Sequence, residues 1–141
     1  MIALVVVSHS EQAATGIAEV AAEMGGDARI VPVGGDPDGG IGTTAPSIAD
    51  AIERAARGED GAEAVDGETA DGVVILVDLG SAVMNAQLAI ETLDVDYDVQ
   101  LVDAPILEGT LNAAVAAASP KATLEEVVAR AEEARDYRKL D

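Results

Sequence analysis

The sequence lacks cysteine, phenylalanine and tryptophan, and its only aromatic residues besides one histidine are Tyr97 and Tyr137. Without cysteine the chain has no disulfide and no thiolate site, which is typical of a cytoplasmic protein. Apolar residues still make up 49% of the chain and are mainly alanine, valine, leucine and isoleucine. Because such small side chains pack helices closely onto a sheet, we expect a folded α/β core.

Basic residues are also scarce. The sequence has 8 lysines and arginines and 27 acidic residues, which gives a formal net charge of -19. This charge repels nucleic acid backbones and anionic membrane surfaces, which excludes both as partners. The apolar start of the chain is too short for a membrane helix and has no basic region before it, so neither a span nor a signal peptide is predicted. Only Lys121 and Lys139 are lysines, and an acidic, lysine-poor surface is typical of halophilic proteins.

Hydrophobic periodicity predicts one domain, over residues 1–141, in which strands alternate with helices. Apolar, β-branched runs predict strands at 2–7, 29–33, 73–79 and 99–103. Helical spacing predicts helices at 11–24, 46–57 and 82–93, another after 104, and a last one that begins with Thr123 and Glu126 as a capping box. The acidic, glycine-dotted segment 58–72 has no period and is predicted to be a surface loop.

The same spacing predicts which side of each helix faces the core. The residues expected to face inward are Ile17, Val20, Ala21 and Met24 in the first helix, Ile48, Ala51, Ile52 and Ala55 in the second, and Leu124, Val127, Val128 and Ala131 in the last. These faces would cover both sides of a sheet.

The order of the elements predicts an open, mostly parallel sheet of four to five strands with helices on both faces. In such a fold the first strand lies beside the second and the third, and ligands bind where the strand order reverses. Ser8, His9 and Ser10 follow the first strand, and Asp78, Leu79, Gly80 and Ser81 follow the third. We therefore expect the only histidine of the chain to meet a carboxylate, hydroxyl groups and two helix N-termini in one crevice.

Each of these features also has a purely structural interpretation. A single histidine after a strand is often a capping or solvated residue, and Asp78 could cap the third helix. Ser8 with Glu11, or Ser10 alone, could cap the first helix. The glycine-rich loop 34–44 lacks the lysine of a P-loop, so its glycines are expected to serve turns. Only the convergence of the features favours a functional site.

Four segments together resemble the enzyme IIA domain of the mannose class: VSHS at 7–10, GIGTTAPSIADAIE at 40–53, VDLGSAVMNAQLAIE at 77–91 and APILEGTLNAAV at 104–115. They are most similar to the phosphoryl-donor branch that serves the phosphoenolpyruvate-dependent dihydroxyacetone kinase. The resemblance implies that His9 receives a phosphoryl group from the phosphocarrier protein HPr. It also implies that His9 passes the group to ADP bound on the nucleotide subunit of the kinase, and that the chain forms a homodimer. Relatives can carry fused HPr and enzyme I domains, which are not expected within residues 1–141.

The chemistry of a phosphohistidine assigns roles to the residues expected around His9. Asp78 would accept a hydrogen bond from the proton-bearing ring nitrogen, while Ser8, Ser10, Gly80 and Ser81 would hold phosphoryl oxygens. Thr43 and Thr44 would reach the rim of the site. No cofactor and no metal ion is expected at this site.

The basic residues point to a partner that completes the site. Arg29, Arg54 and Arg57 are expected at the opposite edge of the sheet from His9, so a partner protein would supply the cation that phosphoryl transfer needs. Two alternatives stay open at this stage: a mannose-class sugar-transport enzyme IIA, and a non-catalytic flavodoxin-like binding module.

Overall fold

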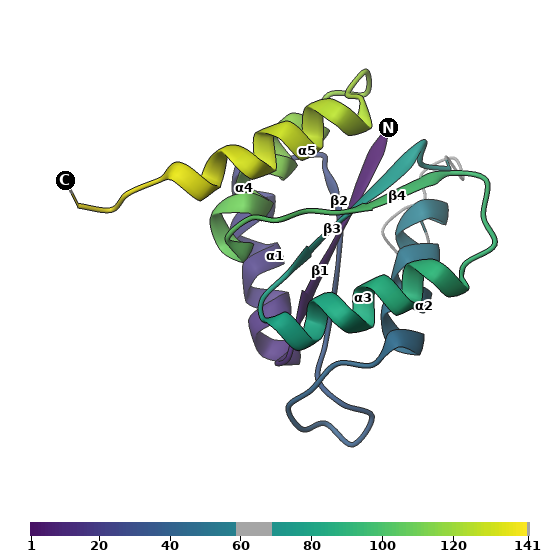
Figure 1. Cartoon of the computed structure of the whole chain (residues 1–141). Coiled ribbons are helices and arrows are strands. Elements are labelled where there is room, and N and C mark those ends of the chain that lie inside the picture. Colours follow the sequence, from purple (N-terminus) through teal and green to yellow (C-terminus); the bar gives the residue numbers. More distant parts are fainter. Residues whose placement is uncertain (59–68, 141) are drawn as a thin grey trace.

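The computed structural model describes residues 1–58 and 69–140, so most of the predicted acidic loop 58–72 lies outside the described residues. In the described part, strands and helices alternate along the chain (Figure 1). The strands are β1 (Ile2–Ser8), β2 (Arg29–Gly34), β3 (Gly72–Val77) and β4 (Asp98–Leu101). The helices are α1 (Glu11–Gly25), α2 (Ala45–Arg57), α3 (Gly80–Thr92), α4 (Ile106–Ala117), α5 (Leu124–Glu132) and the short 3-10 helix η2 (Glu133–Asp136).

The described strands form one parallel sheet in the order β2-β1-β3-β4, which confirms the predicted arrangement. The strand order reverses between β1 and β3, the two central strands, and every residue of both is buried. In the register, Val7 lies beside Val33 of β2 and Val77 of β3. The segments that follow β1 and β3 therefore leave the sheet side by side, at its carboxyl edge.

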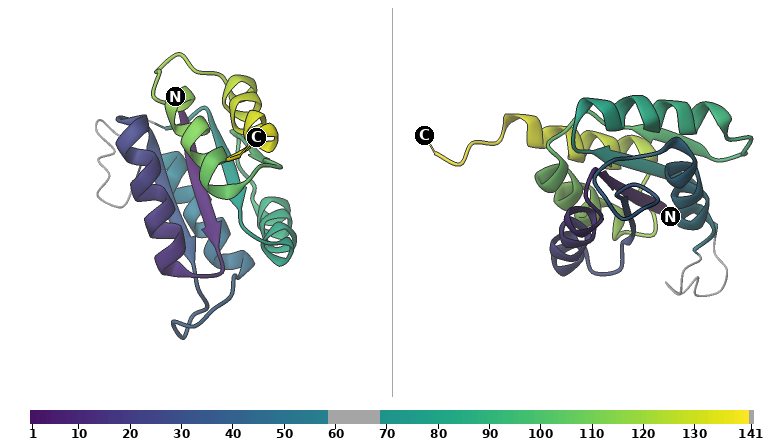
Figure 2. Two further views of the ribbon diagram at one scale, coloured as in Figure 1. Left: turned by 90° about the vertical axis from the view of Figure 1, so that its left-hand side faces the viewer. Right: turned by 90° about the horizontal axis from the view of Figure 1, so that it is seen from below.

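Helices cover both faces of the sheet, and this explains why β1 is a continuous apolar run (Figure 2). Ala3, Val5 and Val7 pack with α2 and α3, whereas Ile2 and Leu4 pack with α1, α4 and α5. A strand with one face in water would need alternating polar residues, which β1 does not have.

The predicted inward faces are confirmed for α2 and nearly so for α5; in α1 the prediction is confirmed for Ala21 and wrong for Val20 and Met24. In α1 the buried residues are Ala14, Ala18, Ala21 and Gly25. Val20 and Met24 are exposed, Met24 by 65%. The reason is close packing against α4, because a Cβ at Gly25 would lie 2.6 Å from the Cβ of Ala114. Only small side chains fit between helices this close, so the larger apolar residues of α1 lie outside the contact.

Three boundaries differ from the predictions in ways that concern the site. Strand β3 ends at Val77 and not at residue 79, so Asp78 and Leu79 follow the strand. Helix α3 begins at Gly80, two residues earlier than expected, so Gly80 and Ser81 form its first turn. Strand β4 ends at Leu101, which leaves Asp103 in the connection to α4. Among the described helices, none is long and apolar enough to cross a membrane.

Candidate functional site

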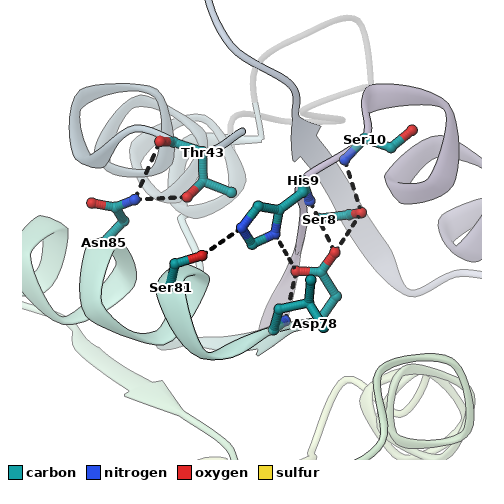
Figure 3. A network of polar contacts seen from close by, with 8 residues as sticks. Ser8, His9, Ser10, Thr43, Asp78, Ser81 and Asn85 are labelled. Carbon is teal, nitrogen blue, oxygen red and sulfur yellow. Dashed lines mark hydrogen bonds and ion pairs between the residues drawn. The ribbon is translucent and has the colours of Figure 1, made fainter. Parts of the chain in front are cut away.

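His9 and Asp78 meet at the carboxyl edge of the sheet, where β1 and β3 end (Figure 3). His9 comes directly after β1 and Asp78 directly after β3. Because these strands are paired in parallel, residues separated by 69 positions lie within hydrogen-bonding distance. The predicted convergence at the reversal of strand order is present in the structure.

Asp78 accepts hydrogen bonds on both carboxylate oxygens. Its Oδ2 accepts from the Ser8 hydroxyl and from the His9 backbone N–H, each at 2.9 Å. Its Oδ1 accepts from the Leu79 backbone N–H at 2.7 Å and lies 2.9 Å from Nδ1 of His9. Partial burial raises the pKa of the Asp78 carboxyl, but the hydrogen bonds from His9, Ser8 and Leu79 outweigh it and leave that pKa below its usual value.

These contacts determine which nitrogen of His9 is available for reaction. An ionised carboxylate only accepts hydrogen bonds, so Nδ1 carries the ring proton and donates the hydrogen bond to Asp78. In the neutral ring Nε2 then has a free lone pair, and it accepts a hydrogen bond from the Ser81 hydroxyl at 2.5 Å. The side chain of His9 is 18% exposed, and the contact between Nε2 and the Ser81 hydroxyl is open to solvent.

The two serines beside His9 have different positions, and both capping predictions that involved Ser8 or Asp78 are wrong. Ser8 is buried, and its hydroxyl donates to Asp78 and accepts from the Ser10 N–H at 3.1 Å. Ser10 is the N-cap of α1 and accepts from the Ala13 N–H at 3.2 Å. The N-cap of α3 is Leu79, which makes no side-chain capping bond. Ser8 therefore faces Asp78, whereas Ser10 and the first turn of α3 are partly open to solvent.

The glycine-rich loop before α2 is joined to the site by two contacts. The Gly42 N–H donates to the His9 carbonyl at 2.8 Å. The side-chain amide of Asn85, in α3, donates to the hydroxyl of Thr43 at 2.7 Å and to its carbonyl at 3.2 Å. Thr44 is the N-cap of α2 and accepts from the Ser47 N–H. The sequence prediction missed Asn85, although it lies one helical turn after Ser81 in the motif GSAVMN.

The contacts of the basic residues confirm that three arginines lie away from His9. Arg29 donates to the Ala55 carbonyl at the amino edge of the sheet, and Arg54 and Arg57 pair with acidic residues of α2. Arg135 is nearer the carboxyl edge, where its guanidinium lies 3.6 Å from the Asp103 carboxylate. In the described part of the chain, the side-chain contacts of His9 are with Asp78 and Ser81 and involve no cation.

The chain is an open parallel α/β domain with a single histidine, bound by an aspartate, at its switch point. A family model described as the fructose IIA component of the PTS system, EIIA-man, matches residues 3–129. The chain belongs to this family of enzyme IIA domains, as the sequence resemblance predicted.

The chain is also similar to curated phosphoryl donor subunits of dihydroxyacetone kinases. The chain is 37% identical to the phosphoryl donor subunit DhaM of PEP-dependent dihydroxyacetone kinase 2 from Listeria innocua, over 82% of this chain and 85% of the relative. It is 38% identical to the corresponding DhaM from Escherichia coli, over 84% of this chain and 24% of the relative. The chain thus spans about a quarter of the length of the E. coli protein.

A solved structure shows the same fold. The crystal structure of EF1359, a protein of unknown function, superposes with a TM-score of 0.77 at 29% identity. The superposition covers 99% of this chain and 98% of that one. The whole described architecture, from β1 to the C-terminal helices, is therefore shared with a solved structure.

Proposed function

We propose that this chain is a phosphohistidine carrier, which receives a phosphoryl group on His9 from HPr and passes it to ADP on the nucleotide subunit of a dihydroxyacetone kinase. The observation that carries the proposal is the hydrogen bond between Nδ1 of His9 and the carboxylate of Asp78. It leaves Nε2, the nitrogen at the crevice surface, as the nucleophile. Relatives named as phosphoryl donor subunits support the choice of this branch of the family.

In the loading step, the Nε2 lone pair attacks the phosphorus of the phosphorylated donor. The new bond between Nε2 and phosphorus forms as the bond between phosphorus and the donor's nitrogen breaks, and the donor's ring keeps that electron pair. His9 then carries a positive ring whose Nδ1 proton stays hydrogen bonded to Asp78. The carboxylate stabilises this charge and holds the ring in one orientation.

In the unloading step, an oxygen of the terminal phosphate of ADP attacks the phosphorus on His9. The bond from phosphorus to Nε2 breaks, and its electrons return to the ring as a lone pair. ATP forms on the partner, and His9 is neutral again with its proton on Nδ1. The Nδ1 proton, hydrogen bonded to Asp78, does not move in either step.

We propose that three groups bind the phosphoryl oxygens. The Ser81 hydroxyl, which donates to Nε2 in the free protein, turns to a phosphoryl oxygen once Nε2 is occupied. The backbone N–H groups of Gly80 and Ser81, in the first turn of α3, lie at a positive helix end that has no side-chain cap. The Ser10 oxygen accepts from the Ala13 N–H as the N-cap of α1, and we propose that its O–H is a further donor. Thr43 and Thr44 hold the neighbouring loop and are assigned no direct contact.

The buried Ser8 has a different role from the one predicted for it. Its hydroxyl donates to Asp78 and is not free for a phosphoryl group, so we assign it to positioning the carboxylate. Because the side-chain contacts of His9 in the described residues include no cation, the positive charge for the transfer comes from the partner. The chain is proposed to act as a homodimer, which sedimentation equilibrium would test.

The experiment is a transfer of label. The protein is loaded with radioactive phosphate from phosphoenolpyruvate through enzyme I and HPr, and is then mixed with the ADP-loaded nucleotide subunit. The label should leave His9 and appear in ATP, and dihydroxyacetone phosphate should form when the substrate subunit is added. If the label stays on His9 in the presence of the nucleotide subunit but moves to a sugar-specific IIB protein, the chain serves sugar transport and not the kinase. A protein that takes no label would be a binding module.

A further inference from the structure

Asp78, His9 and Ser81 are joined by hydrogen bonds into a chain that ends at a serine hydroxyl (Figure 3). The Asp78 carboxylate accepts from Nδ1 of His9 at 2.9 Å, and Oγ of Ser81 donates to Nε2 at 2.5 Å. In unrelated folds this series of carboxylate, imidazole and hydroxyl converts a serine into a nucleophile, because the imidazole takes the hydroxyl proton as the oxygen attacks. The phosphoryl carrier uses Nε2 as a nucleophile, whereas here Nε2 would act as a base.

Ser81 lies where a nucleophilic serine is accessible to a substrate. It is exposed in the first turn of α3, which follows the buried strand β3 at the carboxyl edge of the sheet. The N-cap of α3 makes no side-chain capping bond, so the backbone N–H groups of Gly80 and Ser81 are available to an acceptor. N–H groups in this position can stabilise the oxyanion that forms when a serine attacks a carbonyl carbon. The site therefore holds a nucleophile, a base and oxyanion donors.

The surface around Ser81 indicates the class of substrate. Leu79 and Met84 lie just before and just after Ser81 in the chain and are 61% and 71% exposed. They offer apolar contact to the acyl part of a substrate. The net charge of -19 repels anionic substrates. Small uncharged esters with an apolar acyl group therefore suit this site better than acyl phosphates or other anionic acyl donors.

We propose that Ser81 is a nucleophilic serine and that this site hydrolyses small uncharged esters, an activity distinct from the phosphoryl transfer proposed above. In the first step, Oγ of Ser81 attacks the carbonyl carbon of the ester, and its proton moves to Nε2 of His9. The bond from that carbon to the alcohol oxygen then breaks, and the alcohol leaves with the proton from Nε2. The Nδ1 proton stays hydrogen bonded to Asp78 throughout.

In the second step, water removes the acyl group. Nε2 of His9 takes a proton from the water as the water oxygen attacks the acyl carbon. The bond from that carbon to Oγ of Ser81 breaks, Oγ recovers its proton from Nε2, and a carboxylic acid is released. Because Nε2 cannot accept a proton while it carries a phosphoryl group, phosphorylation of His9 would abolish the esterase activity.

The test is the reaction with a fluorophosphonate ester, an uncharged probe that modifies activated serines. Oγ of Ser81 should attack its phosphorus, the bond from phosphorus to fluorine should break with release of fluoride, and the hydroxyl proton should move to Nε2 of His9. Mass spectrometry of the digested, unsubstituted protein should place the phosphonyl group on Ser81. An adduct on His9 or on another serine, or no adduct, would overturn the proposal.

Variants measure what each of the three residues contributes to the reaction with the probe. Ser81→Ala and His9→Gln should each lower the labelling rate at least about 100-fold, and Asp78→Asn should lower it at least about tenfold. Ser119→Ala is the matched control, because Ser119 is an exposed serine after the end of α4, and this variant should label at the rate of the unsubstituted protein. Circular dichroism establishes that each variant is folded. A folded Ser81→Ala that labels at the control rate would refute the nucleophile.

Turnover is measured with p-nitrophenyl butyrate, an uncharged ester, and with p-nitrophenyl hemisuccinate, which carries a carboxylate. The butyrate should be hydrolysed at least about tenfold faster in dilute buffer, and molar potassium chloride should narrow the difference because salt screens the repulsion. If Ser81→Ala keeps the butyrate rate, the imidazole alone hydrolyses the ester and the nucleophilic serine is refuted. Equal rates for the two esters in dilute buffer would refute the substrate class. None of these measurements needs a phosphoryl donor, so they are independent of the carrier function.

Discussion

The carboxylate of Asp78 contacts His9 twice, since one oxygen accepts from the backbone N–H and the other lies at Nδ1, both at 2.9 Å. One side chain thus fixes both the path of the chain after β1 and the orientation of the imidazole ring. The pairing of β1 with β3 makes this possible, because it brings the segments after the two strands together. The reactive Nε2 is consequently directed to Ser81 at the start of α3.

Replacing His9 should abolish labelling. Because His9 is the only histidine, His9→Gln leaves no imidazole to form a phosphohistidine, and the labelled band should disappear. Circular dichroism and thermal melting of the variant would show that the fold is retained. Acid-labile label on the folded variant would place the modification on another residue.

Asp78→Asn should slow the loading of His9 by about 10- to 100-fold, the usual effect of losing a carboxylate that orients a functional histidine. The amide cannot hold the Nδ1 proton as a carboxylate does, so the ring loses its fixed tautomer and the charge that stabilises its phosphorylated form. Single-turnover labelling by phosphorylated HPr measures the rate, and the effect should fall on kcat rather than KM. An unchanged kcat would show that Asp78 has a structural role and no role in the loading of His9.

Asp78 should also contribute a pH-dependent part of the stability. Its pKa is lower in the folded chain than in the unfolded chain, so its stabilising contribution is complete above the unfolded pKa of about 3.9. That contribution is lost as the pH falls through the folded pKa. The difference in free energy of unfolding between the unsubstituted protein and Asp78→Asn should shrink as the pH falls below about 4. Urea denaturation would measure it, and a difference that grows in acid would contradict the sign.

Gly34→Ala should destabilise the protein and impair the site together. A Cβ at Gly34 would lie 2.5 Å from the Ser8 carbonyl oxygen and 2.8 Å from that of Ser10, so the segment that carries His9 has to shift. We expect a loss of about 1–3 kcal/mol, a melting temperature lower by several degrees and slower labelling.

Gly16→Ala in α1 is the matched control for Gly34→Ala. A Cβ at Gly16 meets nothing within 4 Å, and alanine favours the helix by about 0.5–1 kcal/mol, so this variant should melt higher. Equal melting of the two variants would show that the close approach at Gly34 is not a constraint.

Salt should stabilise the fold. The net charge of -19 produces self-repulsion that is weakly screened in dilute buffer, where the Debye length is about 30 Å at 0.01 M, and strongly screened at 1 M, where it is about 3 Å. Melting temperature, followed by circular dichroism, should be clearly higher in molar potassium chloride than in dilute buffer. Equal melting temperatures would remove the halophilic interpretation of the composition.

Hydrophobic periodicity was enough to predict the strands, the parallel sheet and the reversal between β1 and β3, because a strand buried on both faces must be continuously apolar. It was not enough for the inward face of α1. Periodicity assigns the core to the largest apolar residues, but the close approach of α1 and α4 admits only Ala and Gly, and Met24 is left outside. The distance between α1 and α4 depends on the side chains of both helices, so the periodicity of α1 alone does not predict it.

The sequence by itself determined that His9 and Asp78 would meet, since topology alone brings the carboxyl ends of adjacent parallel strands together. Only the tertiary structure decided how they meet. The bond from Nδ1 to Asp78, the bond from Nε2 to Ser81, the burial of Ser8 against the carboxylate and the link from Asn85 to Thr43 all depend on side-chain positions after packing. Residue types and spacing select which groups share a crevice, whereas the choice of donor and acceptor within it depends on distances of a few ångströms that arise only when the helices and strands are packed together.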